Sequence, residues 1–562
     1  MRTPSLRLVN DYARAVVSEK VAAGEYVRLA CQRHLDDLDR AKGKDFPYEF
    51  DKERAARVIN FVEKMPHTKG RWAAKRETIK LEPWQCFFYG CVFGWVRKSD
   101  GNRRFREAYL EVPRKNGKSI IAAAIGHYCL VADGEYGAEI LAGATTEKQA
   151  WEVFRPARLM ALRCDGYKEH FGVEVNASNM MRSEDFSRFE PLIGNPGDGS
   201  SPSCAIVDEY HEHKNSDLFD TMMTGMGSRE QPLMLVITTA GSNLAGPCYE
   251  KRVEVQKILK GVFDADRTFG IIYSLDDGDD WKDPKNWAKA NPNLGVSLSI
   301  DYLDAQVQAA VRSSSKQNSV KTKHFNLWVG ARSAWLNMEC WNKQADDTLC
   351  ESDFYDLPSW EGLDLATKLD IAARVSLFVK QINGQPNYFL FPTFYLPEDA
   401  LESSKNAKQY QGWAAQGYLN VMEGAEIDFK VIQDEILDLR KTRKVSELVY
   451  DPWQATQLAQ AVRAEGVEAV EYRPTVGNLS PPMREFEAAI ASGRLHHPDN
   501  PVLNWMASNV VAKSDAKDNI FPRKELPDSK IDGIVAGLFA LGRAMHSVEE
   551  SHAYQTRGFS TL

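Results

Sequence analysis

The stretch Ala108-Tyr-Leu-Glu-Val-Pro-Arg-Lys-Asn-Gly-Lys-Ser119 decides the fold of the first half of the chain. Residues 108–112 are apolar enough for a buried strand, and a helix is expected to follow through Val131. A Gly-Lys-Ser turn between a strand and a helix is typical of a P-loop, in which backbone N–H groups at the helix start hold phosphate oxygens. Val112 stands where the P-loop consensus opens with glycine, so the motif is a variant.

Each polar residue of this turn has an expected role in binding ATP. Lys118 would reach the β- and γ-phosphates, and the Ser119 hydroxyl would bind Mg²⁺. Arg114, Asn116 and Gly117 belong to the same predicted phosphate cradle. The Gly-Lys-Ser sequence alone is weak evidence, because an ordinary helix can also begin with a serine near its cap.

Two acids at the end of a later strand strengthen the prediction. The run Cys204-Ala-Ile-Val-Asp208-Glu209 is apolar until its last two residues. In a P-loop enzyme such an Asp208 would hold Mg²⁺ through water, and Glu209 would polarise the attacking water. The next strand ends in Ile237-Thr-Thr-Ala-Gly241, whose small hydroxyl residues suit a sensor of the γ-phosphate. Together these parts predict an ATPase.

Gln85, in Leu81-Glu-Pro-Trp-Gln85, is a candidate for reading the adenine of ATP. An ordinary helix start after Pro83 explains the same residues, because proline is common at the first position of a helix. Both interpretations stay open at this point.

The chain alternates short apolar strands with helical runs, which predicts an α/β protein with a mostly parallel sheet in its first half. The strands expected there are 108–112, 138–142, 203–207, 233–237 and 269–273. A second α/β pattern begins near Gly362, and its expected elements are strands 363–365, 375–380, 388–394 and 448–450 and a final helix at 532–545. We predict five parts: a helical N-terminal extension (1–80), a P-loop ATPase domain (81–275), a connecting region (276–355), a second α/β domain (356–548) and a flexible tail (549–562).

Three aspartates of the second pattern fall at the ends of elements. Asp364 lies in the first strand, Asp451 ends the strand Leu448-Val-Tyr-Asp451, and Asp532 begins the final helix. Carboxylates in these places can converge on one sheet edge and hold two Mg²⁺ or Mn²⁺ ions for phosphodiester cleavage. Each also has an ordinary explanation, since Asp451 and Asp532 suit helix caps. Four other acids compete for the site: Asp370, Glu423, Glu426 and Asp428.

Two further clusters have open interpretations. His496-His497-Pro498 either binds a metal or a phosphate or forms a surface turn, which is the simpler explanation. Arg440-Lys-Thr-Arg-Lys444 either contacts a DNA backbone or ends a solvated helix.

Composition excludes several classes of protein. The 562 residues include 70 Lys and Arg against 78 Asp and Glu, a net charge of −8, so any DNA contact must come from local basic patches. Hydrophobic residues at 43% exclude a disordered chain or a small disulfide scaffold. The 9 cysteines are spread singly without CxxC, which favours a reducing compartment over a zinc ribbon. Without a signal peptide or a membrane span in the sequence, we expect a soluble, intracellular protein with no membrane partner.

The order of these motifs resembles the large terminase subunit of tailed bacteriophages, the genome-packaging motor. Singly most of the motifs are weak, and in this order they are highly specific. They extend over about residues 81–545 and comprise 84–85, 113–119, 143–150, 207–210, 238–241, 290–295, 325–328, 362–365, 450–453 and 531–533.

The resemblance implies a two-part enzyme. Its N-terminal ATPase would be of the additional-strand type, and residues 238–241 would couple hydrolysis to movement. Its C-terminal nuclease would be ribonuclease-H-like, and its metal ligands would be Asp364, Asp451 and Asp532. The arginine that the family brings to a neighbouring subunit's ATP has one candidate in cis, Arg114. The candidates in trans are Arg155, Arg158 and Arg229.

The resemblance also implies a biological setting. The motor would translocate double-stranded viral DNA into the procapsid in the cytoplasm of the infected host, and it would be absent from the mature virion. It would work as a ring, commonly of five subunits, docked on the portal protein. A small terminase subunit would select the viral DNA.

Three alternatives from other classes stay open. A repair-type helicase–nuclease shares the ATP site but needs further helicase motifs and a second P-loop-like lobe, and the nuclease pattern begins too soon for these. A transposase or integrase would use three acids beside a structural P-loop, which the intact ATPase set argues against. A scaffold that only binds nucleotide would show no ATP turnover.

Overall fold

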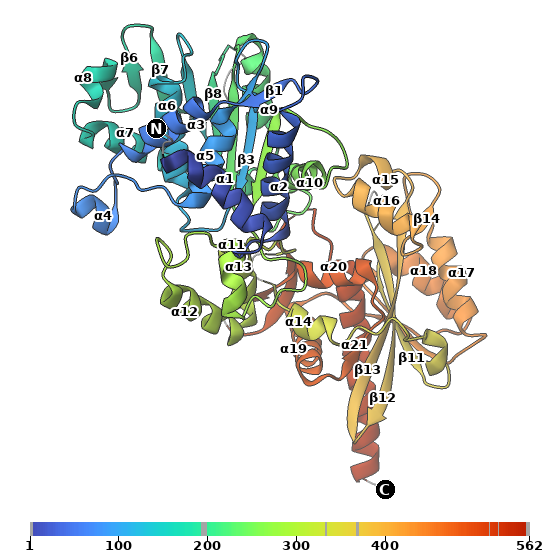
Figure 1. Cartoon of the computed structure of the whole chain (residues 1–562). Helices are drawn as coiled ribbons and strands as arrows, with labels where there is room; N and C mark the ends of the chain where they lie inside the picture. The colour runs from blue at the N-terminus through green and yellow to red at the C-terminus, as the bar shows by residue number, and fades with distance from the viewer. Residues whose placement is uncertain are drawn as a thin grey trace. The chain divides into compact units, whose positions relative to one another are not determined.

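The structure, a computed structural model, describes residues 4–192, 199–331, 334–366, 370–515, 517–526 and 528–557. The chain divides into two compact units (Figure 1). Unit 1 comprises Met1–Arg312 and Ser319–Val329, and unit 2 comprises Ser313–Asn318 and Gly330–Leu562. The connecting region expected at 276–355 is therefore shared between the two units rather than forming a part of its own.

Unit 1 is built on an eight-stranded sheet in the order β10-β3-β9-β8-β4-β7-β6-β5. Neighbouring strands are parallel from β10 to β7, and β6 and β5 are antiparallel. The strands are β3 (Glu107–Glu111), β4 (Glu139–Gly143), β5 (Val173–Val175), β6 (Met180–Arg182), β7 (Ser187–Leu192), β8 (Cys204–Asp208), β9 (Leu233–Thr238) and β10 (Thr268–Ile272). All five strands expected in this half are confirmed. β7 escaped prediction because charged residues and a proline interrupt its apolar pattern.

The helices of the expected N-terminal extension are part of the same core as the sheet. The extension expected at 1–80 contains α1 (Pro4–Val17), α2 (Glu25–Arg40), α3 (Lys52–Glu63), α4 (Gly70–Ala74) and β1 (Tyr48–Phe50). It is followed by α5 (Pro83–Gly94) and by β2 (Trp95–Arg97), which pairs with β1. Val9, Cys31 and Val58 from three of these helices are fully buried in the cluster that contains the strand residues. The N-terminal segment is therefore folded as part of unit 1.

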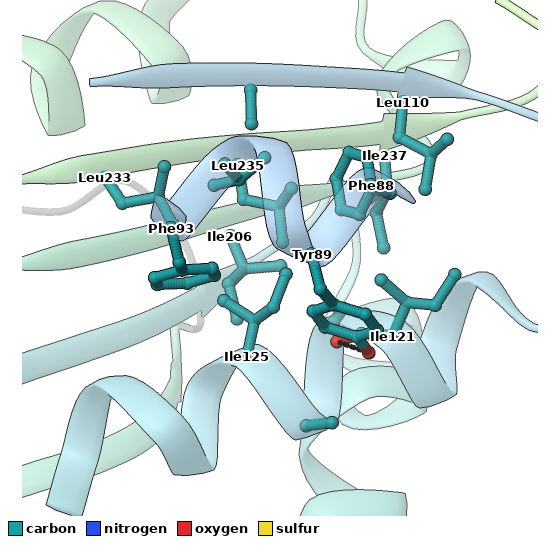
Figure 2. Close-up of a cluster of buried hydrophobic side chains, with 14 of the residues drawn as sticks. Phe88, Tyr89, Phe93, Leu110, Ile121, Ile125, Ile206, Leu233, Leu235 and Ile237 are labelled. Carbon is teal, nitrogen blue, oxygen red and sulfur yellow. Dashed lines mark hydrogen bonds between the residues drawn. The ribbon is translucent and has the colours of Figure 1, made fainter. Parts of the chain in front are cut away.

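Figure 2 shows the centre of this core, where helices α5 and α6 (Lys118–Val131) pack on strands β3, β8 and β9. The hydroxyl of Tyr89 in α5 donates a hydrogen bond to the Ile121 carbonyl in α6 at 3.3 Å. Helix α5 is apolar on all sides because it also contacts α1 and α3 on its outer face. This packing fixes α6, and with it the phosphate turn, against the sheet.

The rest of unit 1 consists of helices around the sheet. They are α7 (Glu147–Arg163), α8 (Tyr167–Phe171), the short η1 (Tyr210–Glu212), α9 (Asp217–Gly225), α10 (Pro247–Leu259), α11 (Trp287–Ala290), α12 (Ile300–Val311) and most of α13 (Ser314–Phe325). A separate apolar cluster around Trp287 and Phe325 holds the last three together.

Unit 2 has a mixed sheet in the order β14-β13-β12-β11-β15-β16, and β17 pairs with β13. The strands are β11 (Ser359–Asp364), β12 (Ala372–Ile382), β13 (Gln385–Pro397), β14 (Asn420–Met422), β15 (Val445–Tyr450), β16 (Ala469–Glu471) and β17 (Leu495–His496). β11, β12 and β13 are antiparallel, and β15 and β16 extend the sheet parallel to β11. This is the ribonuclease-H-like arrangement that the resemblance implies, and the four strands expected here are confirmed.

Helices and one hairpin surround the sheet of unit 2. They are α14 (Met338–Asn342), α15 (Ala400–Ser403), α16 (Ala407–Ala415), α17 (Phe429–Leu439), α18 (Pro452–Ala464), α19 (Val476–Ser492), α20 (Pro501–Asn509), the hairpin of β18 (Val510–Ser514) and β19 (Ile520–Lys524), and α21 (Asp532–Arg557). The predicted final helix is confirmed, and it is longer than expected. Helix α21 continues through residues 549–557 of the expected tail, and residues 558–562 lie outside the described residues.

Helix α21, drawn in red in Figure 1, packs along β11 and β12. The closest approach is at Gly362, where an added Cβ would lie 1.9 Å from the Ala536 carbonyl oxygen. Only glycine allows the helix backbone to come so near the strand. This contact sets the position of Asp532, at the start of the helix, relative to Asp364 at the end of the strand.

All nine cysteines lie in the described part of the chain and are free thiols. In the same residues, no helix combines the length and the apolar character needed to cross a bilayer.

Replacing Gly362 with alanine should destabilise unit 2. The new Cβ would overlap the α21 backbone, which cannot move without disturbing the core, so we expect Gly362→Ala to lower the free energy of unfolding by about 1–3 kcal/mol. Urea denaturation of the full chain measures the change. Gly412→Ala in α16 is the matched control, since its Cβ would meet nothing within 4 Å. That variant should be neutral or more stable, by up to about 1 kcal/mol. Equal stability of Gly362→Ala and the wild type would mean that the contact is looser than described.

Candidate nucleotide and metal sites

The turn between β3 and α6 is a short loop shaped by two residues in the left-handed region. Lys115 has φ 72° and Gly117 has φ 88°. Helix α6 begins directly after Gly117, so the N–H groups of its first turn lie at the loop. Such a turn has the backbone donors and the positive helix end that a phosphate requires.

Lys118 is the buried cation of this loop. Its Nζ donates to the Val112 carbonyl at 3.0 Å, and Ser119 is half-buried beside it. Burial lowers the pKa of the ammonium, while the charges of Glu209 and Asp208 act to raise it. Lys118 and the acid pair of Asp208 and Glu209 are far apart in the sequence, but their charges interact in the folded chain. The lysine suits an anionic phosphate, and the two acids suit the metal cation that accompanies a nucleotide.

Two asparagines from a distant segment hold the loop in place. The fully buried Asn116 donates through Nδ2 to Oδ1 of Asn291 at 3.0 Å, and its Oδ1 accepts from the backbone N of Asn293 at 3.0 Å. The indole of Trp84 donates to Oδ1 of Asn293 at 2.7 Å. Asn291 and Asn293 were not predicted as site residues. The only signal was the Asn-Pro-Asn run within one of the weak motifs.

Gln85 closes the N-terminus of α5 in a capping box, in which its Oε1 accepts from the backbone N of Glu82 at 2.9 Å. Its other amide atom, Nε2, faces the phosphate loop, because a Cβ on Gly117 would lie 3.7 Å from it. A cavity of ≈ 300 Å³ opens beside this helix start, and its lining includes Trp84, Tyr273 and Asn291. Gln85 thus caps a helix and borders the loop, and its role in reading adenine stays a prediction.

The acid pair follows β8 at the same edge of the sheet. Asp208 is 3% exposed, and burial first and Glu209 second raise its pKa to about 7, against the opposing effect of Lys118. Glu209 has φ 48°, a left-handed conformation, and its backbone N donates to Oδ1 of Asp208 at 2.8 Å. A carboxylate that is so strongly desolvated, and that forms no ion pair with any residue the structure describes, fits the coordination of a metal ion.

The predicted sensor residues follow β9, the neighbour of β8. Thr238 and Thr239 are fully buried, and the Ala240 backbone N donates to Oδ1 of Asn326 at 3.0 Å. The His211 ring lies against both threonines and against Glu209. His211 was not predicted as a site residue, and its only sequence signal is its position two residues after the acid pair.

The candidate arginines differ in their surroundings. Arg114 is exposed, and its charge lowers the pKa of Lys118, so it lies close to the loop. Arg158 and Arg229 donate to backbone carbonyls of unit 1 through their Nε atoms, at 2.7 and 2.8 Å. Arg155 is exposed, and its guanidinium lies 5.9 Å from the Trp151 ring.

In unit 2, the strands bring two of the three predicted aspartates to the same edge. β11 and β15 are parallel neighbours with Leu363 opposite Tyr450, so Asp364 and Asp451 follow side by side. Asp451 also caps α18, since its Oδ1 accepts from the Trp453 backbone N at 3.1 Å. The cap and the strand-end interpretations of Asp451 are therefore both correct about its position.

Electrostatics ties the third aspartate to the other two. Burial, followed by the charges of Asp532, Asp451 and Asp370, raises the pKa of Asp364 well above its usual range. Burial and then Asp370 raise the pKa of Asp532 to about 6. The Oδ2 atom of Asp532 is buried without a hydrogen-bond partner among the described residues. Mutually repelling, under-bonded carboxylates of this kind fit a divalent cation.

The carboxylates do not form a closed ligand set as they stand. No group of three His, Cys, Asp or Glu side chains is arranged to hold a metal ion in the ranges that the structure describes. Residues 367–369, which precede Asp370 in the sequence, lie outside those ranges. Asp370 forms an ion pair with Lys530 at 2.8 Å, which makes it a fourth acid of the cluster with its own partner.

Several other candidates have structural roles. Among the competing acids, Glu423 and Glu426 are exposed and Asp428 caps α17. The surface-turn interpretation of the histidine pair needs correction, because His497 is fully buried and stacks on the Trp341 ring at 3.9 Å. The basic run 440–444 is not a solvated helix end throughout. Its Arg443 is buried in an ion pair with Glu361 at 2.9 Å.

Comparison with known proteins finds family models that together cover most of the chain. The family model described as "Terminase large subunit, ATPase domain" matches residues 83–257, and "Terminase large subunit, endonuclease domain" matches residues 262–548. Protein YmfN of Escherichia coli (strain K12) is 44% identical over 62% of this chain and 79% of its own length. The terminase large subunit of Enterobacteria phage HK97 is 25% identical over 88% of this chain and 97% of its own.

Among solved structures, the HK97 bacteriophage large terminase covers 87% of this chain and 99% of its own at 25% identity, with a TM-score of 0.43. The endonuclease model alone spans more than half of the chain, and the ATPase model precedes it without overlap. The chain therefore belongs to the terminase large subunit family, the ATPases with an endonuclease domain that drive the packaging of phage DNA.

Proposed function

We propose that unit 1 hydrolyses ATP through Lys118, Ser119, Asp208 and Glu209, and that unit 2 cleaves DNA through Asp364, Asp451 and Asp532. The observation that carries the first assignment is the buried Lys118 ammonium, whose pKa responds to both acids at the end of β8. The observation that carries the second is the placement of Asp364 beside Asp451 at the ends of parallel strands, where burial and the charges of Asp532 and Asp451 raise the pKa of Asp364.

In unit 1, the loop backbone at Gly117 and the first turn of α6 would hold the phosphates of ATP, and Asn116 would keep the loop in shape. Lys118 would neutralise the β- and γ-phosphates. The Ser119 hydroxyl and Asp208 would hold Mg²⁺, whose charge favours the phosphoryl transfer. Glu209 would orient and polarise the attacking water, and Gln85 would read the adenine.

In unit 2, Asp364, Asp451 and Asp532 would hold Mg²⁺ or Mn²⁺, which would supply an activated water and charge stabilisation for the leaving oxygen. Asp451 is restrained for this by its bond to the Trp453 backbone. The unbonded Oδ2 of Asp532 would gain its missing partner. Asp370, held by Lys530, would add negative charge beside the ligands.

The family of this chain also supports a biological setting. We propose that the motor moves double-stranded viral DNA into the procapsid in the host cytoplasm and is absent from the mature virion. It would dock on the portal protein as a ring, commonly of five subunits, and receive DNA from the small terminase subunit. Arg114 would act at the ATP of its own subunit. The candidates that would act at the ATP of a neighbouring subunit are Arg155, Arg158 and Arg229. Arg155 is the most exposed of the three and therefore the most accessible to a neighbour.

Removing the loop lysine or the catalytic acid should stop ATP hydrolysis in different ways. Lys118→Ala loses the charge that neutralises the phosphates, so nucleotide binding and turnover should both fall. Glu209→Gln keeps the shape of the site, so ATP should still bind while turnover falls by about 100-fold or more. Phosphate release and equilibrium binding of a labelled nucleotide separate the two effects. Lys168→Ala, at an exposed lysine of α8, is the control and should hydrolyse ATP normally. Near-normal turnover by Glu209→Gln would remove that residue from the mechanism.

Thr239→Val should separate ATP hydrolysis from DNA movement. The change keeps the volume of a fully buried side chain and removes a hydroxyl that lies 3.4 Å from Nδ1 of His211. We expect partial ATP hydrolysis without DNA packaging, measured in a packaging assay with procapsids. Thr224→Val in α9, at an exposed threonine, should package normally. Normal packaging by Thr239→Val would exclude the coupling role.

Asp364→Asn, Asp451→Asn and Asp532→Asn should each lose Mg²⁺- or Mn²⁺-dependent DNA cleavage, because amides bind these ions poorly. ATP hydrolysis should persist in all three. A plasmid-nicking assay measures cleavage. Asp428→Asn is the matched control, since asparagine caps a helix almost as well as aspartate. Full cleavage by any of the three variants would remove that residue from the site.

The same substitutions make a prediction about stability. A raised aspartate pKa means that the folded state prefers the protonated form, so Asp532 costs stability as the pH rises from about 4 through its folded pKa of about 6. Without metal, Asp532→Asn should therefore be more stable than the wild type above pH 6 by roughly 2–3 kcal/mol, with no difference below pH 4. Adding Mg²⁺ should stabilise the wild type and not the variant. Denaturation at several pH values tests both statements.

A further inference from the structure

His211 lies between the proposed catalytic acid and the proposed sensor strand of unit 1. Its ring is nearly buried, and Nδ1 is 3.2 Å from Oε2 of Glu209 and 3.1 Å from Oγ1 of Thr238. The other ring nitrogen, Nε2, faces Oε1 of Glu212 at 3.2 Å. One nitrogen of this side chain therefore borders both the acid and the threonine.

The hydrogen bonds around Thr238 determine which atom carries the proton. The Thr238 hydroxyl donates to the Thr239 carbonyl at 2.9 Å, so its single hydrogen is used. Its oxygen then accepts from the His211 backbone N at 3.1 Å and from Nδ1 at 3.1 Å. We therefore assign Nδ1 as a donor, and the nearest acceptors of its N–H are Thr238 at 3.1 Å and Glu209 at 3.2 Å, with the Thr239 hydroxyl at 3.4 Å.

Only one of the two nearest acceptors is satisfied. Oε2 of Glu209 is buried and makes no hydrogen bond to any described residue, although Nδ1 is 3.2 Å away. The Glu209 backbone is in the left-handed region, a conformation that needs support from its surroundings. A small rotation of the ring or of the carboxylate would move the hydrogen bond of the Nδ1–H from the Thr238 hydroxyl to the Glu209 carboxylate.

The segment at the end of β9, residues 238–241, contacts the His211 ring. Thr239 lies 3.4 Å from Nδ1 through its Oγ1, and a Cβ on Gly241 would be 3.1 Å from the Cβ of His211. Because the ring is in close contact with residues 238–241, we expect a movement of that segment to displace the ring. The contact joins the sensor segment to the acid through a single side chain.

We propose that His211 is a positioning residue whose Nδ1–H alternates between Thr238 and Glu209, and so sets the orientation of the Glu209 carboxylate according to the position of the 238–241 segment. The inference rests on the proposed role of Glu209 in ATP hydrolysis. It adds a residue that transmits the state of the segment to the acid.

The test compares two amides at this position by steady-state ATP hydrolysis. Asparagine places its NH₂ near the position of Nδ1, and glutamine places it near Nε2. His211→Ala should lower kcat by about 10- to 100-fold with KM for ATP changed less than about threefold, because the phosphate loop is intact. His211→Asn should recover most of the loss, and His211→Gln should not. Glu212→Gln, which alters the Nε2 side, should stay within about threefold of wild-type kcat.

Three outcomes would overturn the inference. Equal kcat for His211→Asn and His211→Gln, or a rise in KM with unchanged kcat, would indicate a merely structural ring. Wild-type kcat for His211→Ala while Glu209→Gln is inactive would also reject it and leave the function of Glu209 intact. An active Glu209→Gln would instead reject the proposed function itself.

A double-mutant cycle tests the link to β9. Thr238→Val removes the competing acceptor, so the effects of Thr238→Val and His211→Ala on kcat should be non-additive by about fivefold or more. This comparison remains informative if His211→Ala folds poorly, since His211→Gln, which has no donor at the Nδ1 position, can replace it in the cycle. Additive effects on kcat would show that the ring does not connect the threonine to the acid.

Discussion

Parallel pairing of strands is the constraint on which both candidate sites depend. Neighbouring parallel strands end at the same edge of a sheet, so whatever follows them is brought together. In unit 1 this edge collects the loop after β3, the threonines after β9 and the acids after β8. In unit 2 the parallel pair of β11 and β15 does the same for Asp364 and Asp451. Pairing of the strands is therefore enough to bring together residues that are distant in the sequence.

The second consequence is that charges are buried before any ligand arrives. Asp208, Asp364 and Asp532 all have raised pKa values because burial and like charges act on them together. Such groups reduce the stability of the folded chain, and only large apolar cores can support them. The cores behind the two sites contain the packed α5 and α6 in unit 1 and the close contact of α21 with β11 in unit 2. Binding of a cation removes the repulsion, so stability and ligand binding are linked.

Prediction from the sequence succeeded where a residue type and its local neighbours determine the role. The apolar strands and the motifs at their ends were placed correctly, because burial of a whole strand leaves a clear pattern. It failed where a role depends on a distant partner. Asn291 and Asn293 hold the phosphate loop from a segment that looked like a linker, and Arg443 looked like a surface residue although it is buried against Glu361. Polar residues of these kinds have no periodicity that distinguishes a buried partner from a solvated one.

The sequence by itself determined the α/β class, the order of the two domains and the chemistry available at each strand end. These properties are local, since they depend on apolar runs, on glycine and lysine in one turn and on acids at strand ends. Only the tertiary structure decided that Lys118 shares its environment with Asp208 and Glu209, that Gly362 admits the backbone of α21, and that His211 lies between an acid and a threonine. The physical reason is that distances between segments far apart in the chain are set by packing of the whole core, which no short stretch of sequence encodes.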